Sequence, residues 1–281
     1  MTTVAYPPDR PLSVGEVLDV AFRIYRATVV RCLLLATCAV IGGQLPSVYA
    51  LVKGRGQPVA ASGMAAMLTL AQDRVWVALY IVGVLLMLTF YGAMLLREQT
   101  LSTAGRAGGE LEAAARRAPA IIGLCILLGL GGAACVMPGF LAEGMLRALL
   151  LLIALLVLSY AFVAISCAVT ILFVEGAGPA TSVARSWRLT AGSFWRLSMI
   201  YTVALIILLA LELVIAAVGG FVVAVLAHGD VASISIFAQV IAILLEALVL
   251  PFYGALALAV LADLKVRKEG ADLAQRLSAT A

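Results

Sequence analysis

The sequence predicts an all-α integral membrane protein with about six transmembrane helices. Of its 281 residues, 64% are hydrophobic and only 12% are Asp, Glu, Lys or Arg, whereas a typical soluble domain is about 45–50% apolar and about 25% charged. Mean hydropathy is +1.13, and the apolar residues form runs close to the roughly 20 residues that cross a hydrocarbon core. A water-soluble fold could not bury this much apolar surface, so a bilayer is the expected solvent.

The long apolar runs give the positions of the spans. The third run contains residues that weaken a helix in lipid, where every backbone group must be satisfied within the helix; they are Gly129, Gly131, Gly132 and Pro138. The sequence therefore leaves open whether the third span is continuous, or kinked or broken. The six spans lie at about 28–51, 75–96, 119–141, 147–173, 198–227 and 233–262.

The uneven distribution of Lys and Arg predicts the orientation, because short cytoplasmic segments retain basic residues and translocated loops lose them. Of the 19 basic residues, only four fall on the side opposite to the N-terminus, namely Lys53, Arg55, Arg74 and Arg147. Both termini are therefore expected in the cytoplasm. The opening residues 1–8 lack the basic region of a cleavable signal peptide, so we expect span one to remain as an anchor.

Three charged segments precede the apolar hairpins that the spans would form. After Ser13, apolar residues occupy one helical face, and Glu16, Asp19, Arg23 and Arg26 occupy the other. Segments 110–117 and 182–196 have a similar character. We predict three hairpins, each preceded by a cytoplasmic amphipathic helix that lies in the membrane interface.

Two short motifs recur at the same separation along the chain. Residues 23–26 and 90–93 resemble residues 185–188 and 252–255, and both offsets are 162 residues. The chain is predicted to be a single polytopic domain, residues 1–281. Within it, the equal offsets predict an internal repeat whose two copies are residues 13–96 and 175–262, approximately, with a middle hairpin at 97–174 between them. The alternative is that arginines and aromatics collect at interfaces and small residues at helix contacts without common ancestry.

The same regions resemble a known family. Residues 10–19 (RPLSVGEVLD) with 22–26 (FRIYR), residues 186–195 (SWRLTAGSFW) and residues 263–273 (DLKVRKEGADL) are similar to the opening, central and closing motifs of a bacterial family labelled as the membrane domain of glycerophosphoryl diester phosphodiesterase. Leu261, Ala262 and Ala271 depart from the aromatic residues of that family. The resemblance implies a bacterial, multi-span module of largely undefined activity, which we expect in the cytoplasmic (inner) membrane.

The phosphodiesterase of the family label is not expected here. Ester hydrolysis would need a metal held by carboxylates and a positioned acid and base, usually with histidines. The chain has one histidine, His228, in a predicted external turn, and it lacks the motifs of nucleophilic or phosphate-binding sites. We therefore expect no enzyme, no cofactor and no metal site.

Two glutamates near the middle of their spans are the candidate intramembrane site. An acidic residue at this depth costs about 2.5–3.5 kcal/mol on insertion scales, so Glu212 and Glu246 should face protein or water. One hypothesis is that the fifth and sixth spans bring them together, where they share a proton or bind a cationic group. The alternative is that each is a protonated packing device that hydrogen-bonds to a neighbouring helix.

Basic residues at the cytoplasmic face are the candidate lipid or partner contacts. Basic groups beside anionic headgroups contribute about 1 kcal/mol each, which favours a lipid anchor; the alternative is docking of a membrane-protein partner. Nucleic acid is not an expected partner, because the basic groups are spread along one face. The candidate contacts are Arg23, Arg26, Arg185, Arg188, Lys265, Arg267, Lys268 and Glu269.

Two function classes follow from these patterns. The first is a non-catalytic inner-membrane scaffold or assembly subunit, which the absent chemistry and the many small residues favour. The second is a transporter or lipid-handling protein that uses Glu212 and Glu246, which the repeat and the buried carboxylates favour. A continuous polar cavity that reaches both glutamates would favour the second class.

Overall fold

The computed structural model describes residues 6–8, 10–52, 73–103, 105, 108–226 and 231–270. This part of the chain consists of helices and contains no strand, which confirms the all-α class. The helices are α1 (Val14–Val52), α3 (Arg74–Ser102), α4 (Glu110–Ala115), α5 (Ala118–Leu141), α6 (Gly144–Ala164), α7 (Ala168–Glu175), α8 (Pro179–Thr190), α9 (Phe194–Leu226) and α10 (Val231–Glu269).

Six helical stretches are long and apolar enough to cross a membrane, as the sequence predicts. Several are longer than predicted, because the helices continue through the charged segments at their ends. The membrane concerned and the orientation of the termini stay predictions. The stretches are Val14–Ala50, Arg74–Ser102, Ala118–Leu141, Gly144–Glu175, Phe194–Phe221 and Ile236–Glu269.

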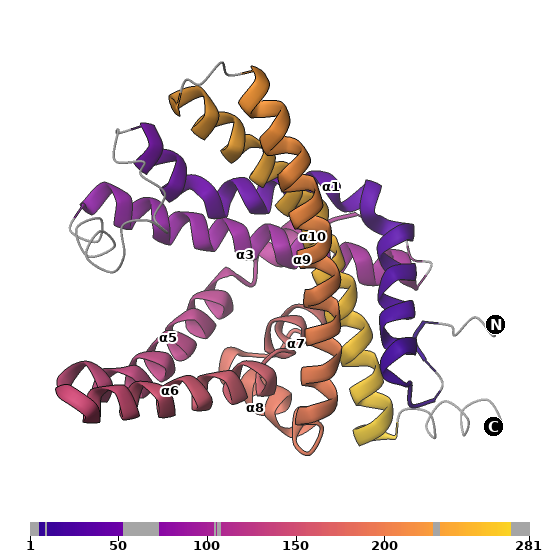
Figure 1. Ribbon diagram of the computed structural model, residues 1–281. Coiled ribbons are helices and arrows are strands. Elements are labelled where there is room, and N and C mark those ends of the chain that lie inside the picture. The colour runs from indigo at the N-terminus through magenta and orange to yellow at the C-terminus, as the bar shows by residue number, and fades with distance from the viewer. Residues whose placement is uncertain are drawn as a thin grey trace.

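The charged segment after Ser13 is the first part of α1 and not a separate helix. A capping box starts it: the Ser13 N–H donates to Glu16 Oε2 at 2.7 Å, and the Glu16 N–H donates to Ser13 Oγ at 3.3 Å. Figure 1 shows that α1 changes direction along its length, so that its first turns lie beside the end of α10. The apolar face of these turns is therefore buried against protein.

The third span is not broken, since α5 runs without interruption from Ala118 to Leu141. Pro138 lies in the last turn, so any bend that it causes falls at the end of the helix. In lipid no water competes for the backbone groups, so a helix tolerates the glycines. Gly139 allows close packing on α6, because a Cβ atom there would lie 2.5 Å from Leu151 Cδ2.

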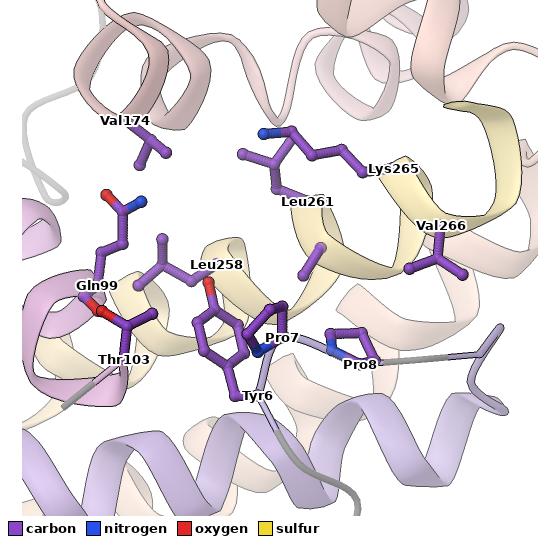
Figure 2. Close-up of a pocket in the computed structure, with 11 residues that line it drawn as sticks. Tyr6, Pro7, Pro8, Gln99, Thr103, Val174, Leu258, Leu261, Lys265 and Val266 are labelled. Carbon is purple, nitrogen blue, oxygen red and sulfur yellow. The ribbon is translucent and has the colours of Figure 1, made fainter. Parts of the chain in front are cut away.

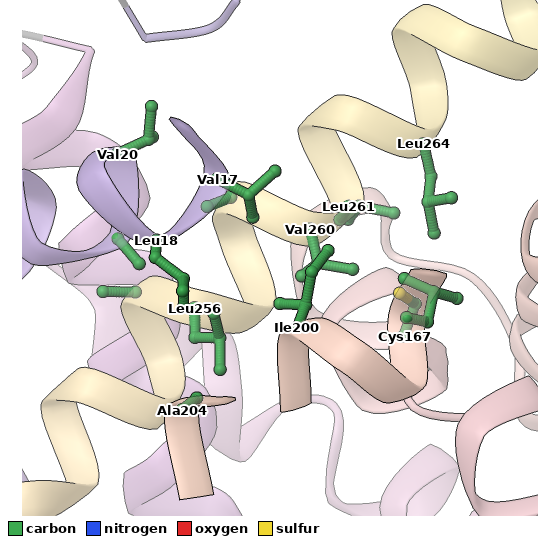
Figure 3. Close-up of a cluster of buried hydrophobic side chains, with 14 of the residues drawn as sticks. Val17, Leu18, Val20, Cys167, Ile200, Ala204, Leu256, Val260, Leu261 and Leu264 are labelled. Carbon is green, nitrogen blue, oxygen red and sulfur yellow. The ribbon is translucent and has the colours of Figure 1, made fainter. Parts of the chain in front are cut away.

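The core lies where the start of α1, the end of α10 and the short helices α7 and α8 gather (Figure 1). One buried cluster joins the start of α1, the start of α9 and the end of α10, with Val17, Ile200 and Leu264 among its members (Figure 3). A second joins the middle of α1, the end of α3 and α7. The α5–α6 pair diverges from α1 and α3 (Figure 1).

Most apolar surface on α5, α6 and α9 is not covered by protein. In one 18-residue apolar stretch of each span, only 11%, 17% and 11% of the residues are buried. Exposed apolar surface of this extent is incompatible with water. It therefore agrees with a bilayer around these helices.

Candidate functional site

The two mid-span glutamates line one cavity. Its volume is about 250 Å³, and it lies among α1, α3, α9 and α10. Glu212 lines the cavity from α9 and Glu246 lines it from α10. Gln44, Met87 and Tyr253 are also part of its wall. The structure thus brings together the two carboxyl groups that depth alone singled out. A cavity of this size exceeds the 150 Å³ that holds a benzene ring.

An amide chain fixes one side of the cavity. Gln44 Nε2 on α1 donates to both carboxylate oxygens of Glu246, at 3.1 and 2.9 Å. Gln239 Nε2, two turns before Glu246 on α10, donates to Gln44 Oε1 at 3.1 Å. The Gln44 amide thereby points its N–H groups at the carboxyl group of Glu246.

The cavity has carboxyl groups without basic counterparts. None of the described residues that line it is Lys or Arg. Two ionised carboxylates in a membrane interior are strongly disfavoured unless a proton or a cation neutralises them. The arrangement can therefore hold a positive charge.

The cavity opens on the surface of the helix bundle. Glu246 is exposed and Glu212 is half-buried, although both lie far from the helix ends. Because the cavity is open at this depth, a ligand can reach it from the surface of the bundle. Lateral access is the geometry that a molecule dissolved in the bilayer needs.

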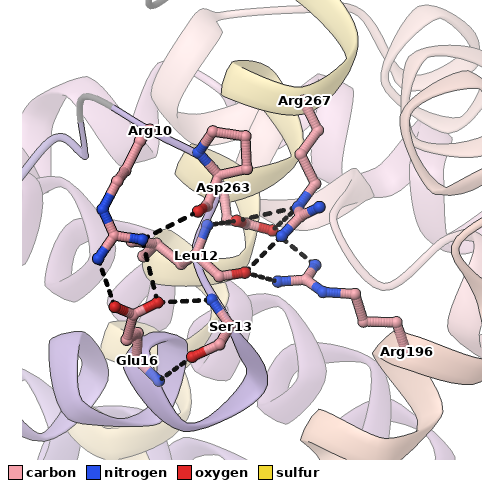
Figure 4. Close-up of polar contacts among 8 residues, drawn as sticks. Arg10, Leu12, Ser13, Glu16, Arg196, Asp263 and Arg267 are labelled. Carbon is pink, nitrogen blue, oxygen red and sulfur yellow. Dashed lines mark hydrogen bonds and ion pairs between the residues drawn. The ribbon is translucent and has the colours of Figure 1, made fainter.

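A buried junction links both ends of the chain to α9 at the cytoplasmic base predicted from the sequence (Figure 4). Asp263 is 1% exposed and accepts hydrogen bonds from the Leu12 N–H at 2.8 Å, Arg196 Nη1 at 2.6 Å and Arg267 Nε at 3.1 Å. Both guanidinium groups also donate to the Leu12 carbonyl. Opening and closing motifs 251 residues apart thus form one unit.

The remaining residues predicted as lipid or partner contacts divide into two groups. Arg185 on α8 pairs with Glu175 and Glu269, at 2.8 Å in each case. Lys265 pairs with the same Glu175 at 2.7 Å, so these side chains bind the protein itself. A second group is exposed on the surface and consists of Arg23, Arg26, Arg188 and Lys268. His228 and residues 271–273 lie outside the described residues.

Glu98 is a site residue that sequence reasoning missed. It is 0% exposed, and among the described residues neither of its carboxyl oxygens has a hydrogen-bond partner. One feature of the sequence could have pointed to Glu98: the helix of the second span continues past its predicted end at about residue 96 and includes this carboxyl group. Because Glu98 follows Arg97 at that end, its position suggested the cytoplasmic interface and not the protein core.

No protein-family model, curated protein or solved structure matches this chain. The resemblance to the phosphodiesterase-associated membrane family therefore stays a prediction, as does the internal repeat. The case for a function rests on the geometry of the cavity.

Proposed function

We propose that this chain is a transport or lipid-handling membrane protein that binds a cationic group between Glu212 and Glu246. The observation that carries the proposal is the shared cavity, which has two carboxyl groups and no described basic side chain in its wall. A positive ligand would supply the missing charge in a medium where Coulomb attraction is weakly screened. Tyr253 adds an aromatic ring, whose face attracts cations.

Binding of a small aromatic amine tests this proposal. We expect the full chain in zwitterionic nanodiscs to bind phenylethylammonium and to bind its neutral analogue phenylethanol at least about tenfold more weakly, which corresponds to about 1.4 kcal/mol. Isothermal titration measures both affinities. The double variant Glu212→Gln/Glu246→Gln should lose the preference for the amine, because it retains volume and removes charge.

Glu143→Gln is the matched control, since Glu143 is an exposed carboxylate at the start of α6. This variant should bind the amine as the unaltered chain does. Equal affinity for the amine and the alcohol would contradict the proposal. Retention of the amine preference in the double variant would do so as well.

The scaffold function is the second candidate, and the surface of α5 favours it. Cβ atoms added at Gly129, Gly131 and Gly132 would meet nothing within 4 Å, so this stretch of α5 has room for a closely packed helix. A photocrosslinking residue at the exposed Leu130 should then give one protein adduct of defined mass in native membranes, whereas the exposed Tyr80 on α3 should not. Lipid adducts alone at Leu130 would argue against a scaffold.

A further inference from the structure

A second cavity lies beside the N-terminal segment. Like the first cavity, it is lined by residues of α3 and α10. Its volume is about 190 Å³, and Tyr6, Pro7 and Pro8 of the N-terminal segment form one wall (Figure 2). On α3 it is lined by Gln99 and Thr103. Leu258, Leu261 and Lys265 line it from α10. We refer to it as the base cavity, and to the cavity at Glu212 and Glu246 as the mid-membrane cavity.

Glu98 lies between the two cavities along the interface of α3 and α10. On α10 the mid-membrane cavity includes Leu250 and the base cavity includes Leu258, and Gly254 lies midway between them. Residues four apart share a helix face, so these three follow one line. A Cβ atom at Gly254 would lie 2.4 Å from Glu98 Oε2. The carboxyl group therefore occupies the space that this glycine leaves.

Among the described residues, no ion pair or hydrogen bond reaches the carboxyl group of Glu98. Tyr6 on the N-terminal segment, Cys32 on α1 and Tyr91 on α3 interact with it electrostatically. Arg97, its neighbour in sequence, pairs with Glu110 of α4 at 3.3 Å. A fully buried carboxyl group without a partner is far more stable in its protonated form.

Tyr6 lines the base cavity and lies within electrostatic range of Glu98. Burial raises the pKa of Tyr6 to about 12. The phenol therefore keeps its proton at physiological pH. Its ring projects among Leu258, Gln99 and Thr103 in Figure 2.

We propose that Glu98 is a proton-binding site that takes up a proton from the base cavity and releases it toward the mid-membrane cavity. In each cycle the Glu98 carboxyl group transfers its proton to a carboxylate of the mid-membrane cavity, Glu212 or Glu246, and becomes a carboxylate itself. It then regains a proton from a hydronium ion that enters through the base cavity, which leaves a water molecule. The ligand of this site is thus a proton. Only the destination of that proton rests on the proposed function.

Infrared spectroscopy of the full chain in bilayers tests this site. We expect a carbonyl band of a protonated carboxyl group at neutral pH that is lost in Glu98→Gln and retained in Glu212→Gln/Glu246→Gln. The band should shift after transfer to deuterated buffer, because Glu98 would exchange its proton with solvent through the base cavity. Tyr6→Ala should accelerate this shift about tenfold by opening the wall, whereas Tyr80→Ala, at an exposed position on α3, should not.

Two results would overturn the inference. One is an unchanged carboxyl band in a Glu98→Gln variant that elutes and melts like the unaltered chain. The other is a Glu98 band that exchanges no faster in Tyr6→Ala than in Tyr80→Ala, since the proton would then have another route. The measurement needs no amine, so a failure to bind phenylethylammonium would leave its outcome unaffected.

Discussion

Replacement of Asp263 by alanine should lower the free energy of unfolding by about 3–5 kcal/mol, the cost of removing one partner from a buried ion pair. The carboxylate is 1% exposed and faces Arg196 and Arg267, whose side chains are only 21% and 32% exposed. Without it, two guanidinium groups face each other across the Leu12 carbonyl, and the Leu12 N–H loses its acceptor. Denaturant titration in detergent, followed by tryptophan fluorescence, measures the loss.

Glu112→Ala provides the matched control for Asp263→Ala. Glu112 also pairs with an arginine, Arg116, but their side chains are 69% and 77% exposed. Such helix-surface pairs contribute about 0.3–0.5 kcal/mol, so this variant should unfold almost as the unaltered chain does. Asp263→Asn should fall between the two, because it keeps acceptor capacity and loses charge. Similar losses in Glu112→Ala and Asp263→Ala would show that the junction contributes little.

Replacement of Gly92 by alanine should destabilise the chain by about 3 kcal/mol, at the upper end of the usual range for overpacking. The new Cβ atom would lie 2.1 Å from Cε1 and Cζ of Phe173. Phe173 is 1% exposed, and a close-packed core gives its ring no free volume into which to move. Either α3 or α7 must shift, and the melting temperature in detergent should fall accordingly.

Gly129→Ala is the control for the steric argument about Gly92. It introduces the same methyl group in a helix, where nothing lies within 4 Å of the new atom. This variant should be neutral or slightly stabilising, because alanine is the better helix former. A second variant, Gly92→Ala/Phe173→Leu, should recover part of the loss, since the smaller side chain relieves the contact. Equal melting temperatures for Gly92→Ala and Gly129→Ala would contradict the argument.

Sequence reasoning found two of the three carboxyl groups on which the proposals depend. Glu212 and Glu246 were predictable because an acidic residue deep in an apolar run is costly unless protein or water receives it. Glu98 was not, because hydropathy locates a residue along one helix and carries no information about what covers it. The N-terminal segment and α10 bury Glu98, and they are distant from it in sequence.

The sequence by itself determined the class of this protein and the number of its apolar helices, because hydropathy and length act locally along the chain. Only the tertiary structure decided that Glu212 and Glu246 share a cavity with Gln44, and that Leu12 meets Asp263. These contacts depend on how the helices cross and slide against each other. Close approaches such as that of Gly83 to the Gly42 carbonyl, where a Cβ atom would lie at 2.5 Å, set this register. Such packing is a property of pairs of helices and is absent from the pattern of either one.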